Sequence, residues 1–198
     1  MRVIDPAGFE AMFRKDADPW NYATSRFEAH KRGILLKACG RGVRGRGLEL
    51  ACANGETTRH LARLCLSLVA LDASPTAVKE AKRRLAGLDR VTVRTALLPD
   101  QMPRGRFDLI VVSELLYYMR ARDADRLVAL LASAVAPAGR IVLLHHHVSF
   151  DDAAQKPDLA QKRACAVLSA RMAQSYHYRN RRFDCASFTA YQSGPGSA

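Results

Sequence analysis

Short apolar runs alternate with amphipathic stretches between residues 47 and 147. The apolar runs predict strands at 47–51, 67–72, 90–95, 107–113 and 140–146. The amphipathic stretches predict helices at 56–65, 74–87 and 121–135. In the second of these helices Ser74 is the expected N-cap and Pro75 the first helical residue. Alternating strands and helices need crossover connections, so the pattern predicts an α/β fold with a doubly wound, Rossmann-like parallel sheet.

The pattern changes on both sides of this region. Phe9, Met12 and Phe13 have helical spacing, and a second helix is expected at 24–39. After residue 148 we expect a helix at about 158–173, and then two strands, in "SYHYRN" and "RFDCASFTAY", joined by a tight basic turn. They would close a seven-stranded sheet with an antiparallel hairpin.

The predicted organisation is therefore one domain. An N-terminal helical lid spans 1–40, a cofactor-binding core 46–147, and the C-terminal helix and hairpin 148–191. The last residues, 192–198, are rich in Gly, Ser and Pro, and we expect them to be disordered.

Composition narrows the class of protein. The chain has 198 residues, 48% of them hydrophobic and 25% charged, as in a globular domain. It has no apolar run long enough to span a bilayer and no secretory h-region, so we expect a cytoplasmic protein. The five cysteines have no CxxC spacing and predict reduced thiols rather than disulfides or a zinc site. The net charge of +12 is compatible with RNA binding, but it is spread along the chain without interleaved aromatic residues. We expect no nucleic-acid or membrane partner.

The loop after the first strand, "ELACANGE" (49–56), resembles a glycine-rich nucleotide loop in which only Gly55 remains. Ligands of such sheets bind beyond the carboxyl ends of the strands. Asp72 ends the second strand about 20 residues past the first loop, where an acid accepts the ribose hydroxyls of a nucleotide. Glu56 would repel a pyrophosphate, whereas Glu49 could reach an ammonium group. The loop therefore favours S-adenosylmethionine over NAD or FAD.

Four segments resemble class I S-adenosylmethionine-dependent methyltransferases: "LELACANGETT", "LVALDASPTAV", "FDLIVVSELLYYM" and "PAGRIVLLHHH". The stretch "DPWNYATSRFEAHKRGILLKA", together with "SELLYYM", resembles the NodS-like family, typified by an N-methyltransferase of a glucosaminyl amine on a chitooligosaccharide. The resemblance implies S-adenosylmethionine as cofactor, no metal, and a small-molecule acceptor such as an amino sugar or oligosaccharide.

The resemblance also assigns residues to the cofactor. They are Glu49, Ala51, Asn54 and Gly55 at its methionine part; Asp72 at the ribose; Ala73, Ser74, Ala96 and Leu97 at the adenine; Ser113 on the pocket floor; Trp20 and Tyr22 in a lid; and Arg26 at the carboxylate. Ala51 and Ala53 stand where the family has glycines, and we expect their backbone to keep a negative φ. Leu97 replaces an acid that often contacts the adenine.

The expected catalytic residues are Glu114, His145 and His147. Glu114 could hold an amine, and a histidine could accept its proton near neutral pH. On a strand, His145 and His147 share one face and His146 takes the other. Tyr117 and Tyr118 could line the acceptor pocket, with core packing as the alternative. O-methylation of another natural product, RNA methylation and a non-catalytic regulator stay open, although no "NPPY"-like or "DPPY"-like motif of base methylation follows the fourth strand.

Overall fold

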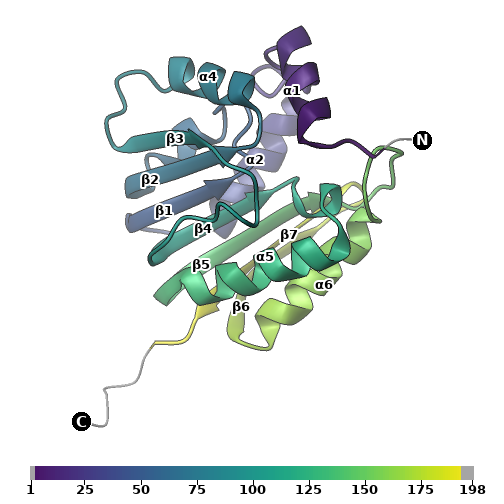
Figure 1. Ribbon diagram of the computed structural model, residues 1–198. Helices are drawn as coiled ribbons and strands as arrows, with labels where there is room; N and C mark the ends of the chain where they lie inside the picture. Colours follow the sequence, from purple (N-terminus) through teal and green to yellow (C-terminus); the bar gives the residue numbers. More distant parts are fainter. Residues whose placement is uncertain (1–2, 193–198) are drawn as a thin grey trace.

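A computed structural model describes residues 3–192, built around one seven-stranded sheet in the order β3-β2-β1-β4-β5-β7-β6 (Figure 1). The strands are β1 (Arg44–Leu50), β2 (Cys65–Asp72), β3 (Val91–Thr95), β4 (Phe107–Ser113), β5 (Val135–His146), β6 (Met172–Arg179) and β7 (Phe183–Ala190). β1 to β5 are parallel, and β7 runs antiparallel to both β5 and β6. The predicted fold class and the C-terminal hairpin are confirmed. Residues 193–198, for which we expected disorder, lie outside the described part.

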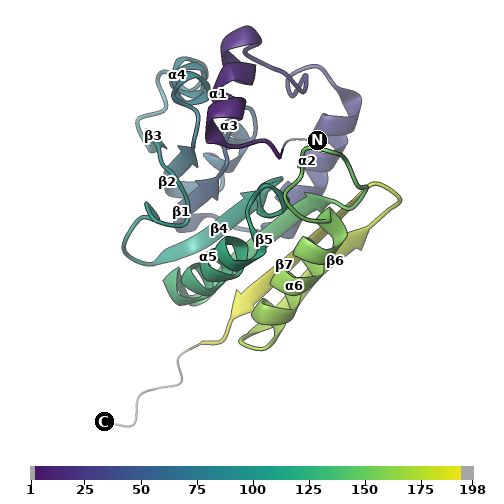
Figure 2. The ribbon, with the colours of Figure 1, turned by 45° about the vertical axis from the view of Figure 1, so that its right-hand side comes forward.

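Helices cover both faces of the sheet (Figure 2). α2 (Arg26–Ala38) and α3 (Thr58–Leu61) pack on one face, and α5 (Ala121–Ala134) and α6 (Pro157–Ser169) on the other. The central strand β4 serves both layers, because Leu109 and Val111 face α2 while Ile110 and Val112 face α5. This explains its unbroken apolar sequence. The two layers fix the carboxyl ends of β1, β2, β4 and β5, where the site lies.

Several predicted elements have different bounds in the structure, and two of these differences follow from strand pairing. The helix expected at 56–65 shrinks to α3, because β2 already begins at Cys65, which pairs with Arg44 of β1. β5 begins at Val135 instead of 140, since Val135 pairs with Phe107 before an irregularity in the register. Pro137 and Gly139 lie within this irregular start of the strand instead of in a loop.

The N-terminal segment lies over the ends of the strands. α1 (Pro6–Lys15) is capped by Asp5, whose carboxylate accepts the Gly8 N–H, and it packs against α4 (Pro75–Arg84). Ser74 caps α4 as predicted, accepting the Ala77 N–H at 3.0 Å. Residues 16–25 connect α1 to α2 and carry Trp20.

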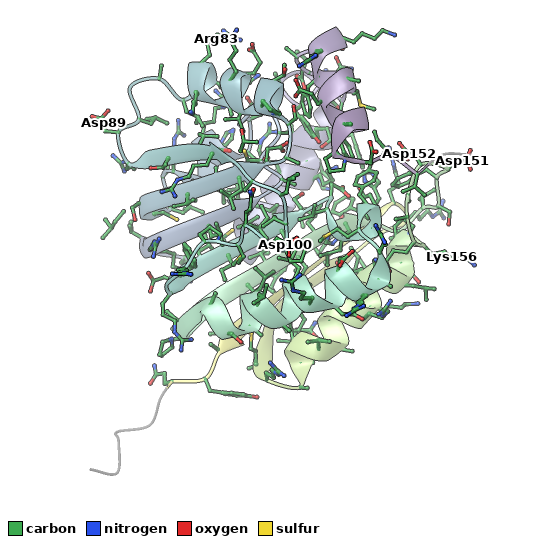
Figure 3. The ribbon with its side chains drawn as sticks, in the orientation of Figure 1. Arg83, Asp89, Asp100, Asp151, Asp152 and Lys156 are labelled. Atoms are coloured by element: carbon green, nitrogen blue, oxygen red, sulfur yellow. The ribbon has the colours of Figure 1, made fainter. Side chains whose placement is uncertain are left out.

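Charged side chains such as Arg83, Asp89, Asp100 and Lys156 extend from the surface of several elements (Figure 3). No helix within residues 3–192 is long and apolar enough to cross a membrane. The five cysteines, all in the described part, form no disulfide.

Candidate functional site

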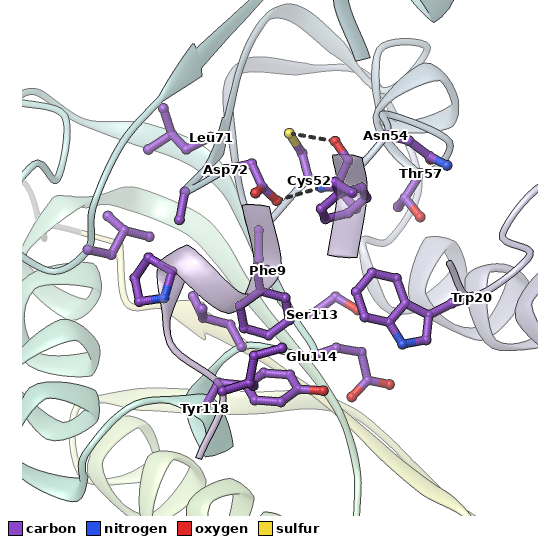
Figure 4. Close-up of a pocket in the computed structure, with 18 of the residues that line it drawn as sticks. Phe9, Trp20, Cys52, Asn54, Thr57, Leu71, Asp72, Ser113, Glu114 and Tyr118 are labelled. Carbon is purple, nitrogen blue, oxygen red and sulfur yellow. Dashed lines mark hydrogen bonds between the residues drawn. The ribbon is translucent and has the colours of Figure 1, made fainter. Parts of the chain in front are cut away.

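A cavity of about 570 Å³ opens at the carboxyl ends of β1, β2 and β4, beneath α1 and the Trp20 segment. Asp72, Asn54 and Thr57 line it from the strand ends, and Phe9 and Trp20 line it from the lid (Figure 4). Most of the expected cofactor residues line this cavity: Trp20, Tyr22, Glu49, Ala51, Asn54, Asp72, Ala73, Ala96, Leu97 and Ser113. The topology therefore brings together residues that are spread over almost a hundred positions of sequence.

Three expected cofactor residues lie outside the cavity lining. Arg26 is exposed at the first position of α2. The hydroxyl of Ser74 donates a hydrogen bond to Glu10 of α1 while also capping α4. Gly55 packs against α4 instead, where a Cβ would lie 3.0 Å from the Cα and the Cβ of Ala81. Gly55 is thus explained by close packing and by its φ of 78°.

The loop at 51–55 corrects one expectation. Ala51 and Ala53 have φ values of 57° and 49°, in the left-handed region, and not the negative φ that we expected. This conformation costs a non-glycine residue about 1–2 kcal/mol. It is held by the Asp72 carboxylate, which accepts the Ala53 N–H at 2.8 Å (Figure 4). The loop keeps the backbone shape of a glycine-rich turn although two glycines are replaced.

Glu56 is not the free negative charge that the sequence suggested. It is 2% exposed, and its carboxylate pairs with Arg59 at 2.8 Å and with Arg84. The Arg32 guanidinium lies 3.7 Å away. Because these arginines compensate its charge, repulsion of a pyrophosphate by Glu56 is a weak argument. No long helix begins at the loop either, so its backbone N–H groups do not form the usual phosphate site.

Glu49 is the best indication of the cofactor's chemistry. It lines the cavity and is 2% exposed, and its Oε2 has no hydrogen-bond partner in the described part of the chain. Burial raises the pKa of Glu49 to about 8. Because burial disfavours the ionised form of Glu49, a cationic group in the cavity is the partner that would stabilise its carboxylate. The ammonium group of S-adenosylmethionine fits this requirement.

Asp72 organises the neighbouring part of the site. Its two carboxylate oxygens accept the backbone N–H groups of Ala53 and Ser74, at 2.8 and 2.9 Å. Burial raises the pKa of Asp72 in spite of these hydrogen bonds. Each oxygen retains a second acceptor position, so Asp72 can serve the loop and a ribose together.

Glu114 follows β4 and has a fully occupied carboxylate. Oε1 lies 2.8 Å from Lys31 Nζ and 2.7 Å from His146 Nδ1. Oε2 accepts the Tyr117 hydroxyl at 2.6 Å and the His146 backbone N–H at 3.0 Å. Although burial alone would raise it, the pKa of Glu114 is held well below its usual range by Lys31 and His146. Four donors leave no position for an amine, so the direct contact expected of Glu114 does not fit this structure.

The three histidines separate. His145 is fully buried, accepts the Leu116 N–H through Nε2 and contacts Gln161 through Nδ1. His147 contacts the carbonyl oxygen of Asn180 through Nε2 at 2.6 Å. Neither lines the cavity, whereas His146 does. Their placement argues against the roles expected of His145 and His147, because β5 turns His146, and neither of its two neighbours, toward the cavity.

Tyr117, Tyr118 and Trp20 line the cavity within an aromatic cluster. The Tyr118 ring meets Phe9 of α1 edge-on at 4.8 Å, and Trp20 lies 5.5 Å from Phe13. Tyr117 is almost fully buried, and its hydroxyl is bonded to Glu114. Tyr117 is therefore mainly structural, and Tyr118 is the more accessible of the two tyrosines in the cavity wall.

Sequence reasoning missed Lys31, Glu28 and His146. Lys31 is 5% exposed and bridges Glu28 and Glu114. It lies one turn after Phe27 and about one turn before Leu35, within the apolar side of α2. An ionisable residue inside an apolar stripe was the signal that could have identified it. Within residues 3–192 no group of three or more His, Cys, Asp or Glu side chains is arranged to hold a metal ion.

Solved structures of methyltransferases share this fold. N-methyltransferase NodS from Bradyrhizobium japonicum WM9, in complex with S-adenosyl-L-homocysteine, superimposes with a TM-score of 0.78 at 20% identity, covering 91% of this chain and 97% of that one. A putative methyltransferase from Pseudomonas syringae gives 0.70 at 33% identity, covering 83% and 99%. The fold is therefore that of class I S-adenosylmethionine-dependent methyltransferases.

The family model of nodulation protein S (NodS) matches residues 6–143, and the chain belongs to the NodS family. Nodulation protein S of Bradyrhizobium diazoefficiens is 36% identical over 104 residues, 52% of this chain. The chain matches 50% to 59% of the length of the nodulation proteins of B. diazoefficiens and Sinorhizobium fredii. A 2-heptyl-1-hydroxyquinolin-4(1H)-one methyltransferase of Mycobacteroides abscessus is 30% identical over 162 residues, 76% of this chain and 67% of that protein.

Proposed function

We propose that the protein is an S-adenosylmethionine-dependent N-methyltransferase acting on a small molecule that carries an amine. The cofactor supplies a methyl group already activated on a sulfonium, so the protein contributes binding, orientation and exclusion of water. Glu49 would hold the ammonium of the cofactor and Asp72 its ribose, with Ala96 and Leu97 beside the adenine. Trp20 and Phe9 cover this space from the lid.

The charge of the cavity carries the proposal. Its described lining contains seven acidic residues and one lysine, namely Asp5, Glu28, Glu49, Glu56, Asp72, Glu114 and Asp152 against Lys31. Arginines outside the lining compensate Glu56, and Lys31 is shared by Glu28 and Glu114, which leaves four acidic residues without a basic partner in the lining. The chain as a whole has a net charge of +12, so this acidic lining stands in contrast to the rest of the molecule. An acidic, aromatic-walled cavity favours a cationic cofactor and an amine. It disfavours a polyanion such as RNA.

An amino sugar, alone or at the end of a chitooligosaccharide, is the acceptor that membership of the NodS family supports. A second candidate is O-methylation of a small aromatic compound. The aromatic walls formed by Phe9, Trp20 and Tyr118 favour it, as does the similarity to the quinolone methyltransferase of M. abscessus.

The test is a methyl-transfer assay with labelled cofactor and matched acceptors. Glucosamine, deacetylated chitotetraose and tryptamine offer an amine, N-acetylglucosamine offers the same ring without one, and 2-heptyl-1-hydroxyquinolin-4(1H)-one offers an oxygen nucleophile. We expect label on at least one amine and none on N-acetylglucosamine. Label on the quinolone alone would support the second candidate, and label on none of these compounds would contradict the proposed activity.

A further inference from the structure

Glu114 and His146 meet at the same edge of the sheet although 32 positions separate them. β4 and β5 are paired, with Ser113 opposite Leu144, and the Glu114 N–H donates to the Leu144 carbonyl at 2.9 Å. Glu114 is the first residue after this pair on β4 and His146 the second on β5, so both emerge at the same end of the sheet, where the His146 backbone N–H donates to Glu114 Oε2 at 3.0 Å. Glu114 and His146 both line the cavity.

The carboxylate of Glu114 determines which nitrogen of His146 carries a proton. Lys31, Tyr117 and the His146 backbone all donate to Glu114, an arrangement that favours the ionised carboxylate. An ionised carboxylate can only accept hydrogen bonds. Nδ1 of His146, 2.7 Å from Oε1, must then carry the hydrogen. In the neutral ring, the lone pair is left on Nε2.

Nε2 of His146 is available to a ligand. The side chain is 22% exposed and lines the cavity, and within residues 3–192 no hydrogen bond to Nε2 is found. The Phe27 ring, 5.7 Å away, packs against the imidazole and limits its rotation. In contrast, both ring nitrogens of His145 are engaged inside the core.

The backbone at Glu114 is also unusual, with a φ of 53°. A left-handed glutamate is strained and persists only where its surroundings over-determine it, often at functional sites. Here the left-handed conformation directs the Glu114 side chain back toward Lys31 and His146. The fold thus maintains the Glu114–His146 pair although the backbone at Glu114 is strained.

We propose that His146 is the proton acceptor for the acceptor's amine, and that Glu114 is a positioning residue that holds the imidazole with Nε2 toward the cavity. The inference rests on the proposed function. The ammonium of the acceptor gives one proton to Nε2, and its nitrogen lone pair then forms the bond to the methyl carbon. The carbon–sulfur electron pair returns to sulfur, and His146 later releases its proton to water.

The other ionisable groups of the site are less suited to this role. Lys31 is a cation shared by two carboxylates. The Tyr117 hydroxyl donates to Glu114, and burial raises its pKa well above the usual value. Glu114 itself is fully occupied. His146 is the group that combines an available lone pair with a place in the cavity wall.

The first test needs no acceptor. In protein labelled with ¹⁵N-histidine, the nitrogen shifts of the neutral His146 ring report its tautomer, and His146→Gln assigns the signal. Charged or titratable groups around the ring are Glu114 after β4, Glu28 and Lys31 on α2, Tyr117 in η1 (Leu116–Tyr118), the neighbours His145 and His147, and Arg182, which stacks on Phe27. We expect the Nδ1–H form in the wild type and its loss in Glu114→Gln. The common Nε2–H form in the wild type would overturn the proposal.

The second test uses methyl transfer to the amines above. His146→Gln should lower kcat/KM by about 10²–10⁴-fold, with S-adenosylmethionine affinity changed less than about threefold. In this variant the acidic limb of the pH–rate profile should move up toward the pKa of the amine, and added imidazole should restore part of the rate. His147→Gln is the matched control and should retain activity. Full activity in His146→Gln overturns the proposal. If the wild type transfers a methyl group to none of the amines, the proposed function is contradicted instead. The tautomer measurement then still tests whether Glu114 positions the His146 ring.

Discussion

Single residues at the strand ends define what the site can hold. Glu49 was predicted from its place on the first strand beside the loop, and Asp72 from its place at the end of the second strand. Both line the cavity. Such positions are readable because strand ends converge in a parallel sheet. The partners of Glu114 were not readable in the same way. Lys31 and His146 meet it only through the packing of α2 and the β4–β5 register.

The three consecutive histidines show most clearly which features of the site the sequence alone does not predict. The period of two predicts that His146 faces away from its neighbours. It does not predict which face meets the cavity, because that depends on how β5 lies between α2 and α6. The structure gives the buried face to His145, against Gln161, and the cavity to His146.

The left-handed alanines yield a prediction of stability. Ala51→Gly and Ala53→Gly each relieve about 1–2 kcal/mol of backbone strain in the folded protein. Each also raises the conformational entropy of the unfolded chain, which lowers stability by about 0.5–1 kcal/mol. Each change should therefore raise the free energy of unfolding by up to about 1 kcal/mol, measured by urea denaturation.

Ala29→Gly is the control for this measurement. Ala29 is exposed within α2, where glycine should lower stability by about 1 kcal/mol. If the loop variants were destabilised as much as this control, the positive φ values of Ala51 and Ala53 would not describe the folded protein.

For the secondary-structure elements, the sequence predicted which helices and strands exist better than it predicted where they begin and end. α4, β4 and α5 begin where their caps and apolar runs indicate. α3 and β5 differ because strand pairing takes residues that local periodicity assigns elsewhere. Thus Cys65 belongs to β2, and Val135 pairs with Phe107 ahead of Pro137. Tertiary pairing of this kind leaves no local sequence signal.

The lid helix α1 is fastened by one carboxylate. Glu10 accepts hydrogen bonds from the Ser74 and Thr76 hydroxyls, at 2.7 and 2.8 Å, and from the Thr76 N–H at 3.1 Å. These bonds, led by that from Ser74, lower the pKa of Glu10 from 4.5 to about 2. Because the folded pKa lies below the unfolded one, the stabilisation is complete above about pH 4.5 and is lost as the pH falls toward 2.

Loss of these hydrogen bonds should undock α1 from α4. Trp20 can report this undocking, since it is the single tryptophan and lies beside Phe9 and Phe13 of α1. We expect its fluorescence to change between about pH 4.5 and 2 in the wild type. Glu10→Gln should show the undocked signal already at neutral pH. Glu80→Gln on α4, which removes an exposed pair with Arg83, should behave as the wild type. Identical acid titrations for Glu10→Gln and the wild type would contradict the fastening role.

At the scale of the whole molecule, the fold and the cofactor class were accessible from sequence, and the acceptor was not. Alternating elements dictate the sheet, and the sheet dictates where a nucleotide binds. The acceptor side combines α1, the Trp20 segment, η1 and residues 146–152, whose mutual placement depends on tertiary packing. Among the sequence arguments for the cofactor, the structure weakens repulsion by Glu56, and the unpartnered Oε2 of Glu49 replaces it.

Whether the cavity binds S-adenosylmethionine can be measured by calorimetric titration of the purified protein at pH 7 with S-adenosylmethionine and, separately, with NADH. We expect saturable binding of S-adenosylmethionine, lost in Asp72→Ala, and no binding of NADH. Binding of NADH without binding of S-adenosylmethionine would show that the cavity is not a methyl-donor site.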